Sequence, residues 1–149
     1  MVSREAIIET ARTYVETPFA HQGRTKGSAL DCVGLPLMVA GDLGLNDKDG
    51  QPLNGGCYTT YSAQPVGNYV YQLCQKHLVY KPVRAMLPGD VLVFNVETAP
   101  CHVGILSEKD GVAYVIHAYN GVGKCVEHVL DYRWRKRLVG CFQFPEVED

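Results

Sequence analysis

The chain has 149 residues, of which 46% are hydrophobic and 20% charged, and its formal net charge at pH 7 is −2. This length fits one domain, so we expect residues 1–149 to form a single folded unit of globular composition. The near-neutral charge argues against a nucleic-acid partner, and the apolar runs are too short to span a membrane.

The first residues, MVSREAIIETARTYVE, predict an amphipathic helix over 3–16 with Ser3 as its N-cap. They carry acidic residues early and lack the apolar core of a signal peptide, so we expect a protein made in the cytoplasm. Its six cysteines are then reduced thiols: Cys32, Cys57, Cys74, Cys101, Cys125 and Cys141. No C-x-x-C pair occurs among them, so we expect neither a bound metal nor any other cofactor.

A loop over residues 20–31 precedes a second helix from about Cys32 to Leu43. Pro36 is tolerated only near the first turn of that helix, and Gly44 is a natural end. Residues 46–65 are typical of a long surface loop, and residues 67–79 have the apolar spacing of a third helix.

After the turn at Pro88-Gly89-Asp90, five short runs rich in β-branched and aromatic residues are separated by turn residues. They are VLVFNV, HVGILS, VAYVIHAY, KCVEHVL and VGCFQF. Because helices come first and strands afterwards, we predict an α+β fold. Its N-terminal helices pack on a mostly antiparallel sheet of five or six strands.

Cys32 stands where the second helix is expected to begin. Unpaired N–H groups at a helix start lower the pKa of a cysteine there and favour the nucleophilic thiolate. The same groups stabilise an oxyanion when the sulfur attacks a carbonyl. A lone cysteine in this place is, however, more often a small buried residue.

Two histidines supply the base that a thiol nucleophile needs. His102 opens the strand HVGILS and His117 lies near the end of VAYVIHAY, and the hairpin loop between them predicts that they are cross-strand neighbours. Gly104, on the same face as His102, leaves room for a helix or a substrate to approach. The alternative is that both imidazoles are ordinary core or edge groups.

Four blocks of the sequence, in order, carry a family resemblance. They are Asp31-Cys32-Val33-Gly34-Leu35, Pro88-Gly89-Asp90-Val91, His102-Val103-Gly104-Ile105 and Ile116-His117-Ala118. With them the chain resembles, from about residue 5 to 145, the NlpC-type family of papain-like cell-wall cysteine peptidases. The stretch TPFAHQGR is similar to the phage tail-associated branch.

The resemblance implies a papain-like fold in which Cys32 is the nucleophile, His102 the general base and acid, and His117 the residue that orients His102. It implies hydrolysis of peptidoglycan stem peptides between D-γ-glutamate and a diamino acid. The partners would be the cell wall and phage tail proteins, and the enzyme would act at the wall after delivery in a virion or by secretion.

The chain departs from the family pattern at two positions that line the expected substrate site. Val33 replaces a common serine, and Phe19 stands where a tyrosine is common, so that His21 is a candidate to take over part of its role. Asp31 either caps the helix or holds a substrate amine, and the cap is favoured.

Other residues have plainer expected roles. His77 and His128 are expected at the surface or its boundary, and the basic run DYRWRKRLVG is expected to be a solvated edge. The alternative for that run is contact with an anionic glycan, peptide or partner, with Trp134 against a sugar ring. Two other functions stay open: a thiol acyltransferase or amidase on the same fold, or a tail-assembly subunit without catalysis.

Overall fold

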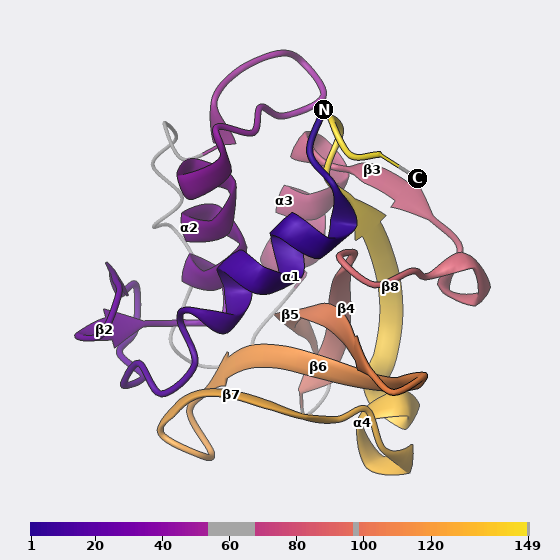
Figure 1. Ribbon diagram of the computed structural model, residues 1–149. Coiled ribbons are helices and arrows are strands. Elements are labelled where there is room, and N and C mark those ends of the chain that lie inside the picture. Colours follow the sequence, from indigo (N-terminus) through magenta and orange to yellow (C-terminus); the bar gives the residue numbers. More distant parts are fainter. Residues whose placement is uncertain (54–67, 97–98, 149) are drawn as a thin grey trace.

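The computed structural model describes residues 1–53, 68–96 and 99–148, which form helices packed on an antiparallel sheet (Figure 1). The helices are α1 (Arg4–Arg12), α2 (Gly34–Leu43), α3 (Tyr69–His77), the 3₁₀ turn η2 (Val83–Ala85) and α4 (Tyr132–Arg137). The strands are β1 (Arg24–Thr25), β2 (Ala29–Leu30), β3 (Val79–Lys81), β4 (Val91–Val96), β5 (Ala99–Lys109), β6 (Val112–Tyr119), β7 (Lys124–Val129) and β8 (Leu138–Gln143). Cys57 and the second part of the expected loop over 46–65 lie outside the described residues.

The main sheet has six strands in the order β3-β8-β4-β5-β6-β7, and every neighbouring pair is antiparallel. This confirms the predicted α+β class and its sheet. The elements that were not predicted include the edge strand β3, the turn η2, the helix α4, and the hairpin of β1 and β2 inside the expected loop over 20–31.

The helix boundaries follow their local signals. The hydroxyl of Ser3 accepts a hydrogen bond from the N–H of Ala6 at 3.0 Å, as expected of an N-cap. Pro36 is the third residue of α2, and Gly44 ends that helix with a left-handed φ of 67°. The helix expected over 3–16 is shorter, because α1 ends at Arg12.

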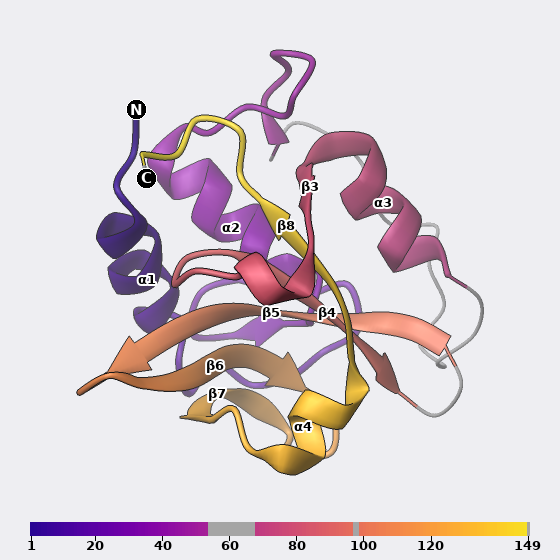
Figure 2. The same cartoon turned by 90° about the vertical axis from the view of Figure 1, so that its right-hand side faces the viewer.

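Two apolar clusters cover the two faces of the sheet. The larger one packs α1, α2 and α3 against strand residues such as Val103 and Ile105. The smaller one lies on the other face and includes Phe94, Leu106 and Trp134, the last of these from α4. Figure 2 shows α1, α2 and α3 to one side of the strands and α4 beside β6 and β7 on the other.

Asp90 ties three distant segments together from inside the fold. Its side chain is fully buried, and its carboxylate accepts hydrogen bonds from Arg4 and Lys81, each at 2.7 Å. Gly89 before it has a φ of +97°, and a Cβ there would lie 3.3 Å from the Cβ of Arg4. The Pro-Gly-Asp turn therefore fixes the start of α1 against β4.

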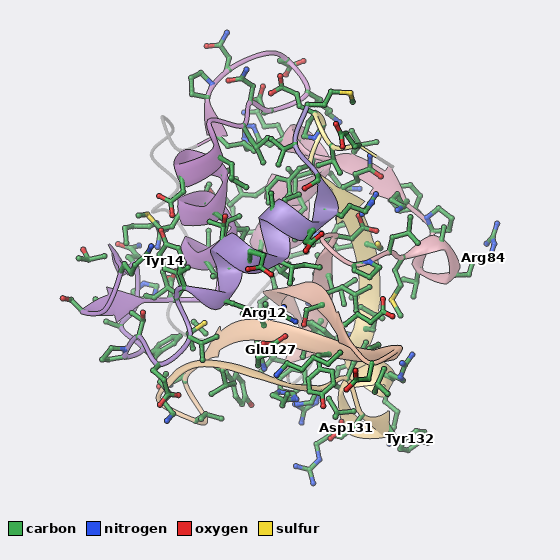
Figure 3. The ribbon with its side chains drawn as sticks, viewed as in Figure 1. Arg12, Tyr14, Arg84, Glu127, Asp131 and Tyr132 are labelled. Atoms are coloured by element: carbon green, nitrogen blue, oxygen red, sulfur yellow. The ribbon has the colours of Figure 1, made fainter. Side chains whose placement is uncertain are left out.

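A second ion pair fixes the other end of α1. Arg12 contacts Glu127 of β7 with an N–O distance of 3.1 Å, and the two side chains face each other in Figure 3. The hydroxyl of Ser107 also donates to the Glu127 carboxylate, at 2.6 Å. The helix is thereby held across β5, β6 and β7.

The two ends of the chain lie side by side (Figure 1). Val2 pairs with Val147 in a parallel bridge, and the N–H of Val2 donates to the carbonyl oxygen of Glu146 at 3.0 Å. Within the described ranges no helix is both long enough and apolar enough to cross a bilayer.

Candidate active site

Cys32 lies two residues before the first residue of α2, in the turn that leads into the helix. The helix start is already occupied by Asp31. Its carboxylate accepts the N–H of Gly34 at 2.8 Å, and its main-chain carbonyl accepts the N–H of Leu35 at 3.3 Å. Two of the helix N–H groups expected to stabilise a thiolate, those of Gly34 and Leu35, are thus paired with Asp31.

The Asp31 side chain is only 2% exposed and also holds the preceding loop. It accepts hydrogen bonds from the main-chain N–H of Gln22 at 2.7 Å and from the guanidinium of Arg24 at 2.8 Å. Its geometry is therefore that of a helix cap and loop anchor, the alternative that the sequence favoured over binding of a substrate amine.

The thiol of Cys32 is partly buried, among residues of the larger apolar cluster. Burial, followed by the negative charge of Asp31, raises the pKa of Cys32 to about 12, whereas the N–H groups of Val103 and Val33 oppose the shift. The expectation of a lowered pKa was wrong, because desolvation outweighs the helix start. At neutral pH this residue is a thiol.

The sulfur lies against the main chain of β5. Its distance to the carbonyl oxygen of Cys101 is 3.9 Å. The pairing of β4 with β5 shifts register there, since Phe94 pairs with His102 but Asn95 pairs with Pro100, which leaves Cys101 as an extra residue. A bulge of this kind bends the strand that contains it. The bend in β5 brings the carbonyl oxygen of Cys101 to Cys32.

His102 and His117 are neighbours, as the sequence predicted. The Nε2 atom of His102 lies 2.7 Å from the Nδ1 atom of His117, and the two residues are 5% and 0% exposed. The space beside Gly104 is filled by the neighbouring strand, because a Cβ there would lie 2.8 Å from Val115 and 3.1 Å from the Cβ of His117. Gly104 thus makes room for His117 rather than for a helix.

Cys32 lies against one side of β5, whereas the side chain of His102, itself a residue of β5, lies on the other. Cys32 packs with the cluster under the helices, whereas the ring of His102 packs against Phe94 and Trp134 of the other cluster. No hydrogen bond joins the Cys32 sulfur to the His102 ring in the described part of the chain. In enzymes without bound substrate, catalytic hydrogen bonds are often long and shorten only when substrate binds.

His128, which the sequence placed at the surface or its boundary, is half-buried and is a third member of the imidazole group. Its Nε2 atom lies 2.8 Å from the Nε2 atom of His117, and its Nδ1 atom lies 2.8 Å from the carbonyl oxygen of Val129. The alternation along β7 was the available signal. It places His128 on the same face as Val126, which pairs with His117.

Trp134 covers the three imidazoles. It is 6% exposed, and its ring centroid lies 4.8 Å from that of His117 and 5.6 Å from that of His102. The suggestion that Trp134 stacks on a sugar ring at the surface was therefore wrong. The four basic residues around Trp134 made this segment look solvent-exposed, whereas it forms the helix α4 with the Trp134 side chain buried.

The closed environment keeps the first two imidazoles neutral. Burial lowers the pKa of His102 to about 3, with the charge of Arg137 adding to the effect. Burial also lowers the pKa of His117 to about 2, with the charges of His102 and His128 adding to it. Both histidines therefore hold a lone pair at neutral pH, which a base requires.

The remaining candidates lie around the start of α2. His21 is exposed in the loop that Asp31 holds, and Phe19 is half-buried with its N–H bonded to the carbonyl oxygen of Gly123 at 2.9 Å. Val33 is 6% exposed and lines an apolar cavity of about 60 Å³ between α2, α3 and the sheet. Over the described ranges no three His, Cys, Asp or Glu residues are grouped to hold a metal ion.

Comparison of the sequence with protein-family models and with curated proteins gives no match. Solved structures of the NlpC/P60 family, however, share the fold. A lipoprotein-like protein of this family from Staphylococcus aureus has a TM-score of 0.62 at 19% identity, over 98% of this chain but 42% of that protein. The NlpC/P60 domain of the peptidoglycan hydrolase SagA has a TM-score of 0.61 at 20% identity, over 96% of this chain and all of that domain.

An N-acetylmuramoyl-L-alanine amidase from Bacteroides uniformis has a TM-score of 0.56 at 12% identity, over 93% of this chain and 96% of that one. The structural neighbours thus include NlpC/P60 peptidoglycan hydrolases, and the papain-like fold predicted from the sequence is confirmed.

Proposed function

We propose that this chain is a cysteine peptidase that hydrolyses peptidoglycan stem peptides, with Cys32, His102 and His117 as its catalytic residues. The observation that carries the proposal is the pair of buried imidazoles, 2.7 Å apart, one of which, His102, lies on β5, the strand whose main chain contacts the Cys32 sulfur. Solved neighbours of the same fold are peptidoglycan hydrolases, which supports the substrate class.

The reaction follows from these groups. Nδ1 of His102 takes the proton of the Cys32 thiol, and the sulfur attacks the amide carbon. The imidazolium returns its proton to the leaving amine as the C–N bond breaks, which leaves a thioester on Cys32. Water then loses a proton to His102, its oxygen attacks the thioester, and the sulfur leaves with that proton as a thiol.

The first step needs a change in the site. The pKa of Cys32 is raised to about 12 by burial, and within the described residues the sulfur contacts the carbonyl oxygen of Cys101 rather than His102. We infer that a bound substrate brings the sulfur and Nδ1 of His102 together, so that the proton moves as attack begins. The thiolate is then formed only when a carbonyl is present to receive it.

We further propose the bond between D-γ-glutamate and a diamino acid as the site of cleavage. The apolar side chain of Val33 gives no hydrogen bond to a charged substrate amine, which would cost about 1–3 kcal/mol. The enzyme is therefore expected to accept stems still attached to glycan. This suits an enzyme delivered by a phage tail, an association that rests on the stretch TPFAHQGR.

Purified peptidoglycan digested by the protein and by Cys32→Ala, with products read by mass spectrometry, tests the proposal. New termini at D-γ-glutamate from the unmodified protein alone support it. Free tripeptide and glycan-linked stems compared as substrates test the role of Val33. A strong preference for the free amine contradicts that role.

A muramyl amidase is the second candidate, because a solved neighbour is an N-acetylmuramoyl-L-alanine amidase. The same digest separates it, since an amidase releases stems with a free L-alanine amine and leaves bare glycan strands. A thiol acyltransferase would modify an amine without a new carboxyl terminus. Intact peptidoglycan would favour a tail subunit without catalysis.

A further inference from the structure

Three histidines from consecutive strands form one chain of hydrogen bonds. His102 on β5 contacts His117 on β6 at 2.7 Å, and His117 contacts His128 on β7 at 2.8 Å. The chain ends where Nδ1 of His128 meets the carbonyl oxygen of Val129 at 2.8 Å. Figure 2 shows the three strands in this order, with α4 beside them.

The last contact sets the direction of all the others. A carbonyl oxygen only accepts hydrogen bonds, so Nδ1 of His128 must carry a proton. In a neutral ring the Nε2 atom of His128 is then an acceptor, and Nε2 of His117 must donate to it. By the same step Nδ1 of His117 accepts, and Nε2 of His102 donates.

One tautomer of His102 follows. With its proton on Nε2, the ring carries its lone pair on Nδ1, the atom that does not contact His117. We propose that His128 is a positioning residue that, together with the carbonyl of Val129, keeps Nδ1 of His102 free to act as the base toward Cys32. This role rests on the proposed peptidase function and extends it beyond the three catalytic residues.

The chain also reverses when His128 takes up a proton. Both nitrogens of His128 then donate, so Nε2 of His117 must accept, Nδ1 of His117 donates, and Nε2 of His102 accepts. His102 remains neutral, but its proton now sits on Nδ1, where it cannot accept from a thiol. The protonation state of His128 therefore decides which tautomer His102 adopts.

Among the described residues, other charged and polar groups also lie near the three linked histidines. Arg137 of α4 opposes a charge on His102, and Tyr119 of β6 stacks on His117 with a centroid distance of 5.7 Å. The β4 residue that contacts His102 is Phe94, which does not titrate. The carboxylate of Asp131, which follows β7 in the sequence, accepts a hydrogen bond from the N–H of Trp134. Among these groups, His128 is the one whose protonation reverses the chain.

Two substitutions at one position separate this role from packing. In His128→Gln the amide can donate to the Val129 carbonyl and accept from His117, with no titrating group. In His128→Phe neither bond is possible. His77→Gln, at the end of α3, is the matched control, because it removes a histidine that is not part of the hydrogen-bonded row.

The values of kcat and KM on glycan-linked stem peptides are the first measurement. His128→Phe is expected to lower kcat at least about 10-fold with little change in KM, a loss smaller than the roughly 10⁴-fold that a wrong histidine tautomer causes elsewhere. His128→Gln, which can form both hydrogen bonds, should keep most of kcat. Equal losses in both variants would overturn the proposal.

The ¹⁵N NMR signals of His102, which distinguish the two tautomers, need no activity. The protein and His128→Gln should carry the proton on Nε2 at neutral pH, whereas His128→Phe should show a mixture. A proton on Nδ1 in the unmodified protein overturns the proposal even if it folds normally. If peptidoglycan is not cleaved, the peptidase function fails while the NMR result still decides the role of His128.

Discussion

Single residues around the thiol carry the most direct test of the site, because burial raises the pKa of Cys32 to about 12. Only the thiolate reacts with iodoacetamide, so we expect the alkylation rate at Cys32 to rise about tenfold per pH unit from pH 6 to 9. Peptide mass spectrometry can follow Cys32 separately from the other cysteines. A plateau beginning below pH 7 would instead indicate a thiolate already paired with an imidazolium.

The charge of Asp31 gives a second prediction at this scale. Asp31→Asn keeps an oxygen for the N–H of Gly34 but removes the negative charge that raises the pKa of Cys32. Alkylation at a fixed pH should therefore become faster. In Arg24→Gln the Asp31 charge loses its ion-pair partner, and alkylation should become slower. A change in the same direction in both variants would indicate a loosened loop rather than an electrostatic effect.

At the scale of elements, the short helix α4 depends on one side chain. Trp134 is 6% exposed and packs against Phe94 with a centroid distance of 5.3 Å. Trp134→Ala is expected to lower the free energy of unfolding by about 3–5 kcal/mol. Tyr132→Ala, 75% exposed on the same helix, should change it by less than about 0.5 kcal/mol. Urea unfolding followed by circular dichroism measures both, and similar losses would contradict the packing role.

The elements that sequence patterns predicted are those with a clear period and a local stop. Gly44 ends α2 because it adopts the left-handed conformation that glycine favours. The alternation in HVGILS placed the side chains of His102 and Val103 on opposite faces of the sheet. The helix α4 was missed because charges surround its one buried residue. The available signal was the N-cap of α4, Asp131, whose carboxylate accepts a hydrogen bond from the N–H of Trp134 at 3.0 Å.

The site was only partly predictable for a physical reason. Strand alternation gives the face of each histidine, but not the cross-strand register that brings His128 to His117. The pKa of Cys32 depends on burial and on groups far away in the sequence, such as the N–H of Val103, which opposes the effect of burial, and no local pattern contains either. Neighbours in the chain were therefore predicted better than neighbours in space.

For the whole molecule, the buried imidazoles make stability depend on pH. The pKa values of His102 and His117 are lowered to about 3 and about 2, whereas an unfolded chain protonates histidine below about pH 6.5. The unfolded state therefore binds more protons, and the stabilisation present above pH 6.5 is lost as the pH falls. From pH 6.5 to 5 the free energy of unfolding should decrease by about 1–2 kcal/mol for each histidine.

Urea midpoints measured across this range test the prediction. His117→Asn keeps a polar side chain but removes one titrating group, so the slope of stability against pH should be shallower than in the unmodified protein. Acidic side chains in unfolded chains titrate mostly below this window. An identical slope in both proteins would mean that His117 is not the buried neutral group described above.

The bridge between Val2 and Val147 places the two ends of the chain next to each other, so the same arrangement of elements is compatible with other sequence orders. A short flexible link could join these two ends, and new ends could be opened in the tight turn at Asp110 and Gly111, both with positive φ. In such a rearranged polypeptide His117 and His128 would precede Cys32, and His102 would follow it, yet each would keep its neighbours. The order of the site residues in the sequence thus depends on where the chain termini lie. Proteins with the same site can carry these residues in a different sequence order.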